Sequence, residues 1–132
     1  MIEINNLTNT RTDEKFFKKV VHKVLKNEKK NKIDLSIALV GLKKIKELNR
    51  KYRRKNRPTD VLSFLYDNSG EIVICPEVVK KNAKKNDLTF KKELTRVLIH
   101  GILHVLGEDH EKSKKEAGKM AKKETFYLEK IF

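Results

Sequence analysis

The stretch HGILHVLGEDH, residues 100–110, carries the strongest structural signal in this chain of 132 residues. Residues four apart on a helix lie on one face, so His100 and His104 can point their imidazoles at the same atom. Gly107 suits the left-handed conformation that ends a helix sharply. The chain then turns back, and His110 can reach the same point from outside the helix. The stretch therefore predicts a helix and a turn that bring three histidines together.

Three neutral imidazoles form the protein half of a tetrahedral zinc site whose fourth position is open to water. Open sites are catalytic more often than structural, because the ion lowers the pKa of bound water to about 7 and polarises an oxygen. Three of the chain's four histidines fall at this spacing. We therefore predict one Zn²⁺ per chain, held by His100, His104 and His110. Other divalent transition metals also accept three imidazoles, so the sequence leaves the native metal open.

The same spacing occurs in zinc proteases with the pattern H-E-x-x-H-x-x-G-x-x-H. This chain has Gly101 where those proteases carry the glutamate that acts as general base. Peptide hydrolysis by their mechanism is therefore disfavoured. One interpretation is that Gly101 keeps the groove beside the metal open to a bulky substrate.

Four other residues could contribute to such a site, and two of them, Asp109 and His22, have more than one interpretation. Asp109 either orients an imidazole as an acceptor, caps the helix end or faces water, and Glu108 is expected to be solvated. His22 has no candidate ligand near it in sequence and is interpreted as structural or solvated. Cys75 is interpreted as a buried, inert thiol, and as the single cysteine it excludes an intramolecular disulfide framework.

Outward from the histidine stretch, the hydrophobic pattern changes period several times and predicts short strands and helices. Thr12 is the predicted N-cap of the first helix, and Ser113 with Glu116 is a capping box before the last helix. Tyr52 is counted among the apolar positions of the second helix. We expect strands near residues 2–7, 33–39, 61–66 and 71–75, and helices near residues 16–25, 42–52, 76–83, 90–106 and 117–131.

The order β-α-β-α-β-β-α-α-α predicts the α+β class. We expect a single domain over residues 1–132, with a small mixed four-stranded sheet, about five helices and a zincin-like metal-binding helix. The first two strands are expected to be parallel, joined by a right-handed crossover, and the last two antiparallel.

The composition is strongly basic: 32 Lys and Arg against 18 Asp and Glu give a net charge of +14. Such a surplus attracts polyanions, so RNA, DNA or an anionic membrane is the expected class of partner. The N-terminus has no apolar signal segment, and no run approaches the roughly 18 apolar residues of a membrane span. We therefore expect a soluble, cytoplasmic domain.

The densest basic cluster is RKYRRKNR, residues 50–57, just before the turn signal of Pro58, Thr59 and Asp60. It is either a solvated helix end, as most charge runs are, or a phosphate-binding loop, because the planar guanidinium group binds phosphate through two hydrogen bonds. Its charged members are Arg50, Lys51, Arg53, Arg54, Lys55 and Arg57.

Three blocks of sequence resemble the YbeY family of bacterial rRNA maturation factors, which are metal-dependent endoribonucleases. The blocks are LNRKYRRKNRPTDVLSF at residues 48–64, GEIVIC at residues 70–75 and HGILHVLGEDH at residues 100–110. The histidine block with glycine in place of the protease glutamate is the most specific of the three. The chain departs from the family pattern at Leu65, where a proline is common, and at Asn56, where an aspartate is common.

The resemblance implies a zinc-like ion on His100, His104 and His110, and a functional arginine at Arg53. It also implies activity on single-stranded RNA, in the processing of ribosomal RNA ends and in ribosome quality control. Ribosomal RNA and the ribosome or its proteins are then the expected partners.

Three hypotheses remain open at this point. The first is a metal-dependent endoribonuclease with Arg53, His100 and His104 as catalytic residues and with either water or the ribose 2′-OH as nucleophile. The second is an RNA- or ribosome-binding assembly factor whose metal is mainly structural. The third, a zinc hydrolase of small or peptide substrates, is disfavoured by Gly101 and by the basic loop.

Overall fold

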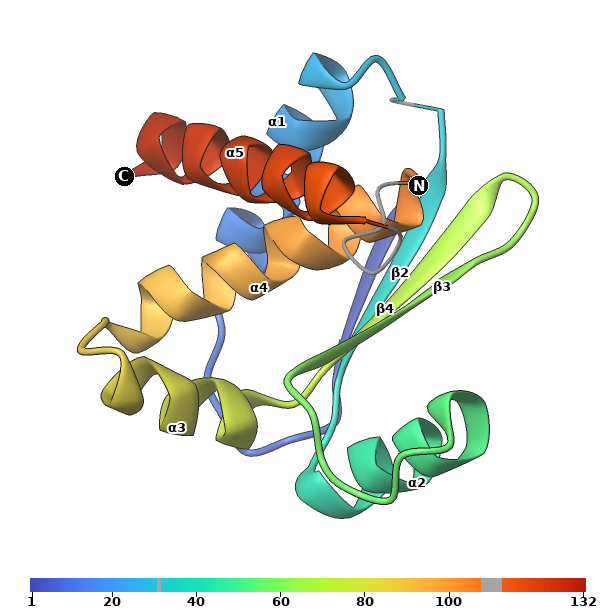
Figure 1. The fold of residues 1–132 in the computed structure, drawn as a ribbon, viewed down its shortest axis with the longest axis vertical. Coiled ribbons are helices and arrows are strands. Elements are labelled where there is room, and N and C mark those ends of the chain that lie inside the picture. Colours follow the sequence, from blue (N-terminus) through green and yellow to red (C-terminus); the bar gives the residue numbers. More distant parts are fainter. Residues whose placement is uncertain (31, 108–112) are drawn as a thin grey trace.

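The computed structural model describes residues 1–30, 32–107 and 113–132 (Figure 1). In these ranges the chain forms four strands and five helices. In chain order they are β1 (Ile2–Asn6), α1 (Glu14–Asn27), β2 (Asp34–Leu39), α2 (Leu42–Arg53), β3 (Val61–Leu65), β4 (Ser69–Ile74), α3 (Pro76–Lys85), α4 (Phe90–Val105) and α5 (Lys114–Ile131). The predicted α+β class and the predicted order of elements are confirmed.

The four strands form one mixed sheet in the order β1-β2-β4-β3. β1 runs parallel to β2, with Ile4 opposite Ile37, and β2 runs parallel to β4. β3 and β4 form the antiparallel hairpin, with Val61 opposite Ile74. Both predicted pairings are confirmed, and β3 is left at one edge of the sheet.

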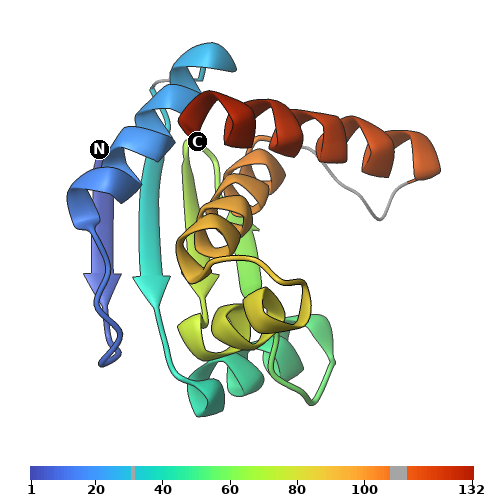
Figure 2. The ribbon, with the colours of Figure 1, turned by 90° about the vertical axis from the view of Figure 1, so that its left-hand side faces the viewer.

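Each face of the sheet carries its own hydrophobic core, because side chains alternate between the two faces of a strand. On β2, Leu35, Ile37 and Leu39 point into the larger core, which α1, α4 and α5 cover (Figure 2). The smaller core lies on the opposite face, where Ile45 of α2 packs with Leu62 of β3. The sheet is therefore enclosed between α4 and α2 at the end where the strands β2 and β4 finish.

Helix α4 lies close against the hairpin because two glycines allow it. A Cβ atom at Gly101 would lie 2.8 Å from Cγ2 of Ile72, and one at Gly70 of β4 would overlap Val105 of α4. The hydroxyl of Ser63 donates a hydrogen bond of 3.3 Å to the carbonyl oxygen of Gly101. The sheet thus fills the space beside Gly101, and our interpretation that this glycine keeps a groove open for substrate is wrong.

Two local expectations need correction, and one is confirmed. Asp13, not Thr12, is the N-cap of α1, since its carboxylate accepts a hydrogen bond of 3.1 Å from the amide of Phe16. Tyr52 is not inward: it is 54% exposed, because α2 buries Ile45 and Asn49 instead. The hydroxyl of Ser113 accepts from the amide of Glu116 at 3.1 Å, as the capping box predicts. Within the described ranges, no helix has both the length and the apolar character that a membrane span needs.

Candidate active site

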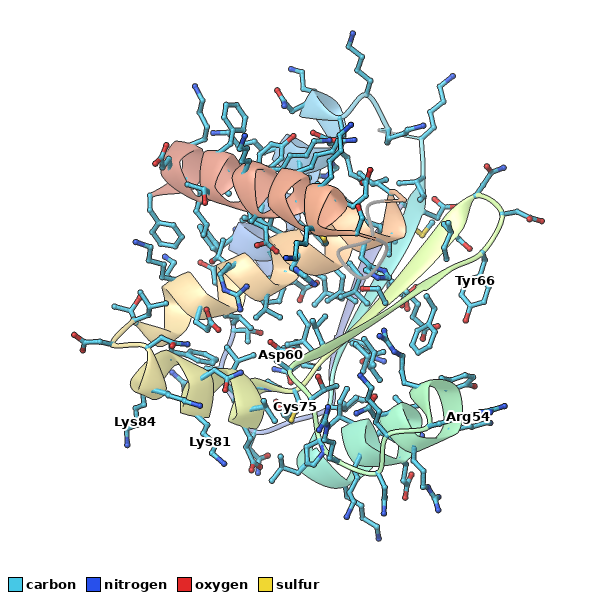
Figure 3. The ribbon with its side chains drawn as sticks, in the orientation of Figure 1. Arg54, Asp60, Tyr66, Cys75, Lys81 and Lys84 are labelled. Atoms are coloured by element: carbon cyan, nitrogen blue, oxygen red, sulfur yellow. The ribbon has the colours of Figure 1, made fainter. Side chains whose placement is uncertain are left out.

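A pocket of about 190 Å³ opens between α4, the start of β3 and the loop that follows α2. Figure 3 places Asp60, one of its lining residues, near the centre of the molecule, between α4 and the first residues of β3. The lining residues are Asn49, Arg53, Lys55, Arg57, Thr59, Asp60, Val61, Leu62, Ser63, His100 and His104. The pocket therefore contains residues from the first and the third sequence blocks.

Helix α4 supplies the two histidines of the pocket. His100 and His104 are one helical turn apart and half-buried, and their ring centroids are separated by 6.5 Å. The structure thus brings two of the three predicted ligands together on one face of α4. His110 and its neighbours Glu108 and Asp109 lie outside the described residues. Within the described part of the chain, no group of three His, Cys, Asp or Glu side chains is placed to hold a metal.

His100 has a partner that the sequence did not indicate. Its Nδ1 atom is hydrogen-bonded to Oε1 of Glu124, which lies on α5, and both side chains are largely buried. Histidines that bind metals commonly donate one ring N–H to a carboxylate, which fixes the tautomer and leaves the other nitrogen as the ligand. Glu124 therefore sets Nε2 of His100 as the atom that can coordinate an ion. Its separation of 24 residues from His100 gave no local signal.

The opposite wall comes from the end of α2 and the loop after it. Arg53 is the last residue of α2, and the chain then turns at Arg54, which adopts the left-handed conformation with φ of 57°. The side chain of Asn49 is 3% exposed and donates a hydrogen bond of 2.8 Å to the carbonyl oxygen of Arg57. Asn49 thereby folds the loop back against α2. Asn49 lies in the first sequence block, but its place in the sequence did not indicate this role.

This turn divides the basic cluster into two groups. Arg53, Lys55 and Arg57 line the pocket with the histidines. The other charged residues, Arg50, Lys51 and Arg54, are exposed and do not line it. Among the described lining residues, Asp60 is the one carboxylate beside three cations. Such a lining suits an anionic ligand, as a phosphate-binding loop requires.

A partly buried ion pair between Arg96 and Glu93 lies on α4, with Arg96 one turn before His100. Both carboxylate oxygens of Glu93 accept from the guanidinium group of Arg96, at 2.7 and 3.0 Å, and Glu93 is 1% exposed. These hydrogen bonds raise the pKa of Arg96 although burial opposes them, and the charges of Glu124 and Asp60 add to the increase. A fixed positive charge therefore lies close to the polar groups around His100.

Neither of the remaining two candidates is among the described residues that line the pocket. Cys75 is a buried free thiol whose pKa is raised mainly by burial, which agrees with an inert role. Figure 3 shows it below Asp60, at the start of α3. His22 is exposed on α1, as expected of a solvated residue.

Comparisons with known proteins cover most of the chain. The family model described as Endoribonuclease YbeY matches residues 2–132. Endoribonuclease YbeY of Thermotoga neapolitana is 48% identical over 102 residues, which cover 76% of this chain and 68% of the relative. That of Thermosipho melanesiensis is 40% identical over 126 residues, covering 93% and 91%. The solution structure of TM1509 from Thermotoga maritima matches with a TM-score of 0.73 at 38% identity, over 99% of this chain and 89% of that one.

Proposed function

Because the chain belongs to the YbeY endoribonuclease family, we propose that it is a metal-dependent endoribonuclease that cuts single-stranded RNA. The observation that supports this most directly is that Arg53 shares a pocket with His100 and His104. A phosphodiester in this pocket lies between a guanidinium group and two imidazoles. We further propose that the substrate is ribosomal RNA, cut during maturation and ribosome quality control in the cytoplasm.

The residues present fit a zinc ion. His100 and His104 supply imidazole nitrogens, which zinc prefers, and the bond from His100 to Glu124 is the support that such ligands usually have. We assign His110 as the third ligand from the sequence motif. Bound there, the ion supplies a Lewis acid and a nucleophile at neutral pH. Nickel, copper or iron suit the same donors.

Arg53, Lys55 and Arg57 bind and orient the RNA. Arg53 is assigned to the reacting phosphate, where its guanidinium N–H groups stabilise the charge that builds up on the phosphorus oxygens. Stabilisation of this kind is typically worth about 3–4 kcal/mol in a site shielded from water. Lys55 and Arg57, from the same loop, suit the neighbouring phosphates. The backbone of the loop is held by Asn49, so the positions from which these cations extend are set before RNA binds.

The test compares cleavage of a single-stranded ribosomal RNA fragment by three zinc-loaded proteins. They are the wild type, His104→Ala and His22→Ala, whose histidine is exposed on α1. Circular dichroism and the measured zinc content show whether each variant is folded and loaded. We expect the wild type and His22→Ala to cut, and folded His104→Ala to be inactive.

Equal cleavage by all three proteins would overturn the assignment of the pocket as the active site. If none of them cuts but all bind the RNA, the protein is an assembly factor whose metal is mainly structural. The product ends identify the nucleophile: a 2′,3′-cyclic phosphate indicates attack by the ribose 2′-OH, and a linear phosphate indicates water.

A further inference from the structure

The pocket is too small to hold more than a short part of an RNA strand. Its volume of about 190 Å³ lies below the roughly 300–1,000 Å³ of pockets that enclose a whole small ligand. The nucleotides on either side of the reacting phosphate must therefore lie on the surface beside the pocket. The end of α2 and the edge strand β3 form this surface, since Arg53 and Leu62 line the pocket from these two elements.

Three aromatic rings lie on this surface, on the face of the sheet that α2 only partly covers. They are Tyr52, Phe64 and Tyr66, which we call the aromatic strip. Tyr52 and Tyr66 are 54% and 55% exposed. Side chains alternate along β3, so Phe64 points to the same face as Leu62, which packs in the smaller core under α2. Figure 3 shows Tyr66 projecting from the hairpin on the side where α2 ends.

The ring of Tyr52 is held in place by a second ring of the aromatic strip. The ring of Tyr52 packs against Phe64 with centroids 5.1 Å apart and an angle of 67° between the planes, an edge-to-face contact. This contact restricts the orientation of Tyr52 although more than half of the residue is exposed.

Positive charges border the strip on the side of α2. The ammonium group of Lys51 lies 5.2 Å from the centre of the Tyr52 ring, and Arg54 is exposed at the end of α2. Tyr52 and Arg53 are adjacent in the chain, and Arg53 lines the pocket. Tyr52 therefore directly precedes a pocket-lining residue, and the cations beside it, Lys51 and Arg54, attract a phosphate backbone.

We infer that Tyr52 and Tyr66 form a stacking platform for unpaired bases of the RNA next to the cleaved phosphate. This rests on the proposed function and adds to it the surface that selects single strands. Aromatic side chains beside a basic groove are the usual device for binding single-stranded nucleic acids, because every base can stack on a ring. Bases in a duplex are already stacked on each other, so the platform favours unpaired RNA.

The test measures binding separately from cleavage. The probe is a short single-stranded 2′-O-methyl RNA that carries 2-aminopurine, whose fluorescence is quenched when the base stacks. The variants are Tyr52→Ala, Tyr66→Ala and the conservative Tyr52→Phe. Phe126→Ala is the matched control, because Phe126 is an aromatic residue 44% exposed on α5, outside the strip. Circular dichroism shows whether each variant is folded. If Tyr52→Ala does not fold, Tyr66→Ala at the hairpin provides the test.

We expect each alanine variant to bind the probe about 5- to 150-fold more weakly, as the loss of one stacked base predicts, and to reduce the quenching. Tyr52→Phe keeps both signals, and Phe126→Ala changes neither. Unchanged binding and quenching in both alanine variants overturns the platform, even if the wild type cuts RNA. Tyrosine-dependent quenching without any cleavage supports the platform and contradicts the proposed nuclease instead.

Discussion

The two walls of the pocket are built in different ways. His100 and His104 lie on α4, a regular helix whose position is set by buried contacts with the sheet. Arg53 and the cations after it lie where α2 ends, in a turn with a left-handed residue and a loop held by the side chain of Asn49. We conclude that the first wall depends on packing and the second on a few polar contacts. Substitutions at the packed positions of the first wall should accordingly affect folding, whereas substitutions of the cations on the second should affect chemistry alone.

The largest effect is expected on the α4 wall, for Gly101→Glu, which restores the glutamate of the protease pattern. The new side chain would meet Ile72 and would bury an unpaired carboxylate between helix and sheet. We expect a loss of more than about 4 kcal/mol of unfolding free energy, or no folding at all, and no peptidase activity. Urea denaturation measures the loss.

Gly118→Glu is the control for this substitution, because Gly118 lies on α5 with no atom within 4 Å of an added Cβ. It should be neutral or slightly stabilising, since glutamate favours a helix more than glycine does. If Gly101→Glu unfolds at the same urea concentration as the wild type, packing does not fix the α4 wall.

On the other wall, Arg53→Ala should reduce catalysis and leave the fold intact. The loss of a charge-stabilising donor lowers the rate about 10²- to 10³-fold, while the melting temperature stays near that of the wild type. The measurement is the single-turnover cleavage rate at saturating RNA. Arg50→Ala, on the same helix but not among the pocket-lining residues, should cost far less. Equal losses in the two variants would mean that this wall contributes only general attraction for RNA.

Glu124→Ala tests a contact that joins α5 to the α4 wall. Loss of the Glu124 carboxylate that contacts His100 should weaken zinc binding about 10- to 100-fold. The zinc affinity of Glu124→Gln should lie between those of Glu124→Ala and the wild type. Competition with a chelator of known affinity measures the change, and the spectrum of the Co²⁺-loaded protein reports the altered ligand geometry. Glu129→Ala, exposed on the same helix, is the control. Unchanged metal affinity in Glu124→Ala would show that the contact is only structural.

The smallest effect is expected outside both walls, at the contact between the end of α1 and α5. Burial, followed by the hydrogen bond to Glu28, raises the pKa of Tyr127 from 10.0 to about 12. Since the folded pKa exceeds the ordinary one, the fold favours the protonated phenol. Its contribution to stability is present below pH 10 and is lost as the pH rises from about 10 to 12.

Tyr127→Phe should therefore lower the free energy of unfolding by about 1 kcal/mol at neutral pH. Between pH 10 and 12 the variant should lose less stability than the wild type. Thermal melts across this range make the comparison. Parallel curves for the two proteins would contradict the raised pKa. RNA cleavage at neutral pH should stay unchanged, because Tyr127 does not line the pocket.

The sequence predicted the features that depend on local periodicity. The order of strands and helices, the parallel pair, the hairpin and the shared face of His100 and His104 all follow from spacings within one element. The N-cap of α1 shows the limit of local periodicity. Thr12 and Asp13 are both suitable N-cap residues, and only the backbone conformation shows that the helix begins after Asp13.

Side-chain contacts between distant segments could not be predicted. Glu124 reaches His100 from another helix, and Asn49 holds a loop through a backbone carbonyl. Neither contact leaves a periodic trace in the sequence. Tyr52 was misplaced because an aromatic residue at a helical spacing usually faces the core. The roles of Arg53 and His110 remain predictions.

The close contact between α4 and the hairpin also restricts how the sequence can change. A glutamate at position 101 requires a shorter side chain at Ile72 at the same time, because the two would occupy the same space. We expect the substitution at position 101 alone to give an unstable protein, although the protease pattern differs by a single residue at this position. The glycine and the glutamate forms of the histidine motif differ by one residue, but the packing of α4 on the sheet opposes the change from one to the other.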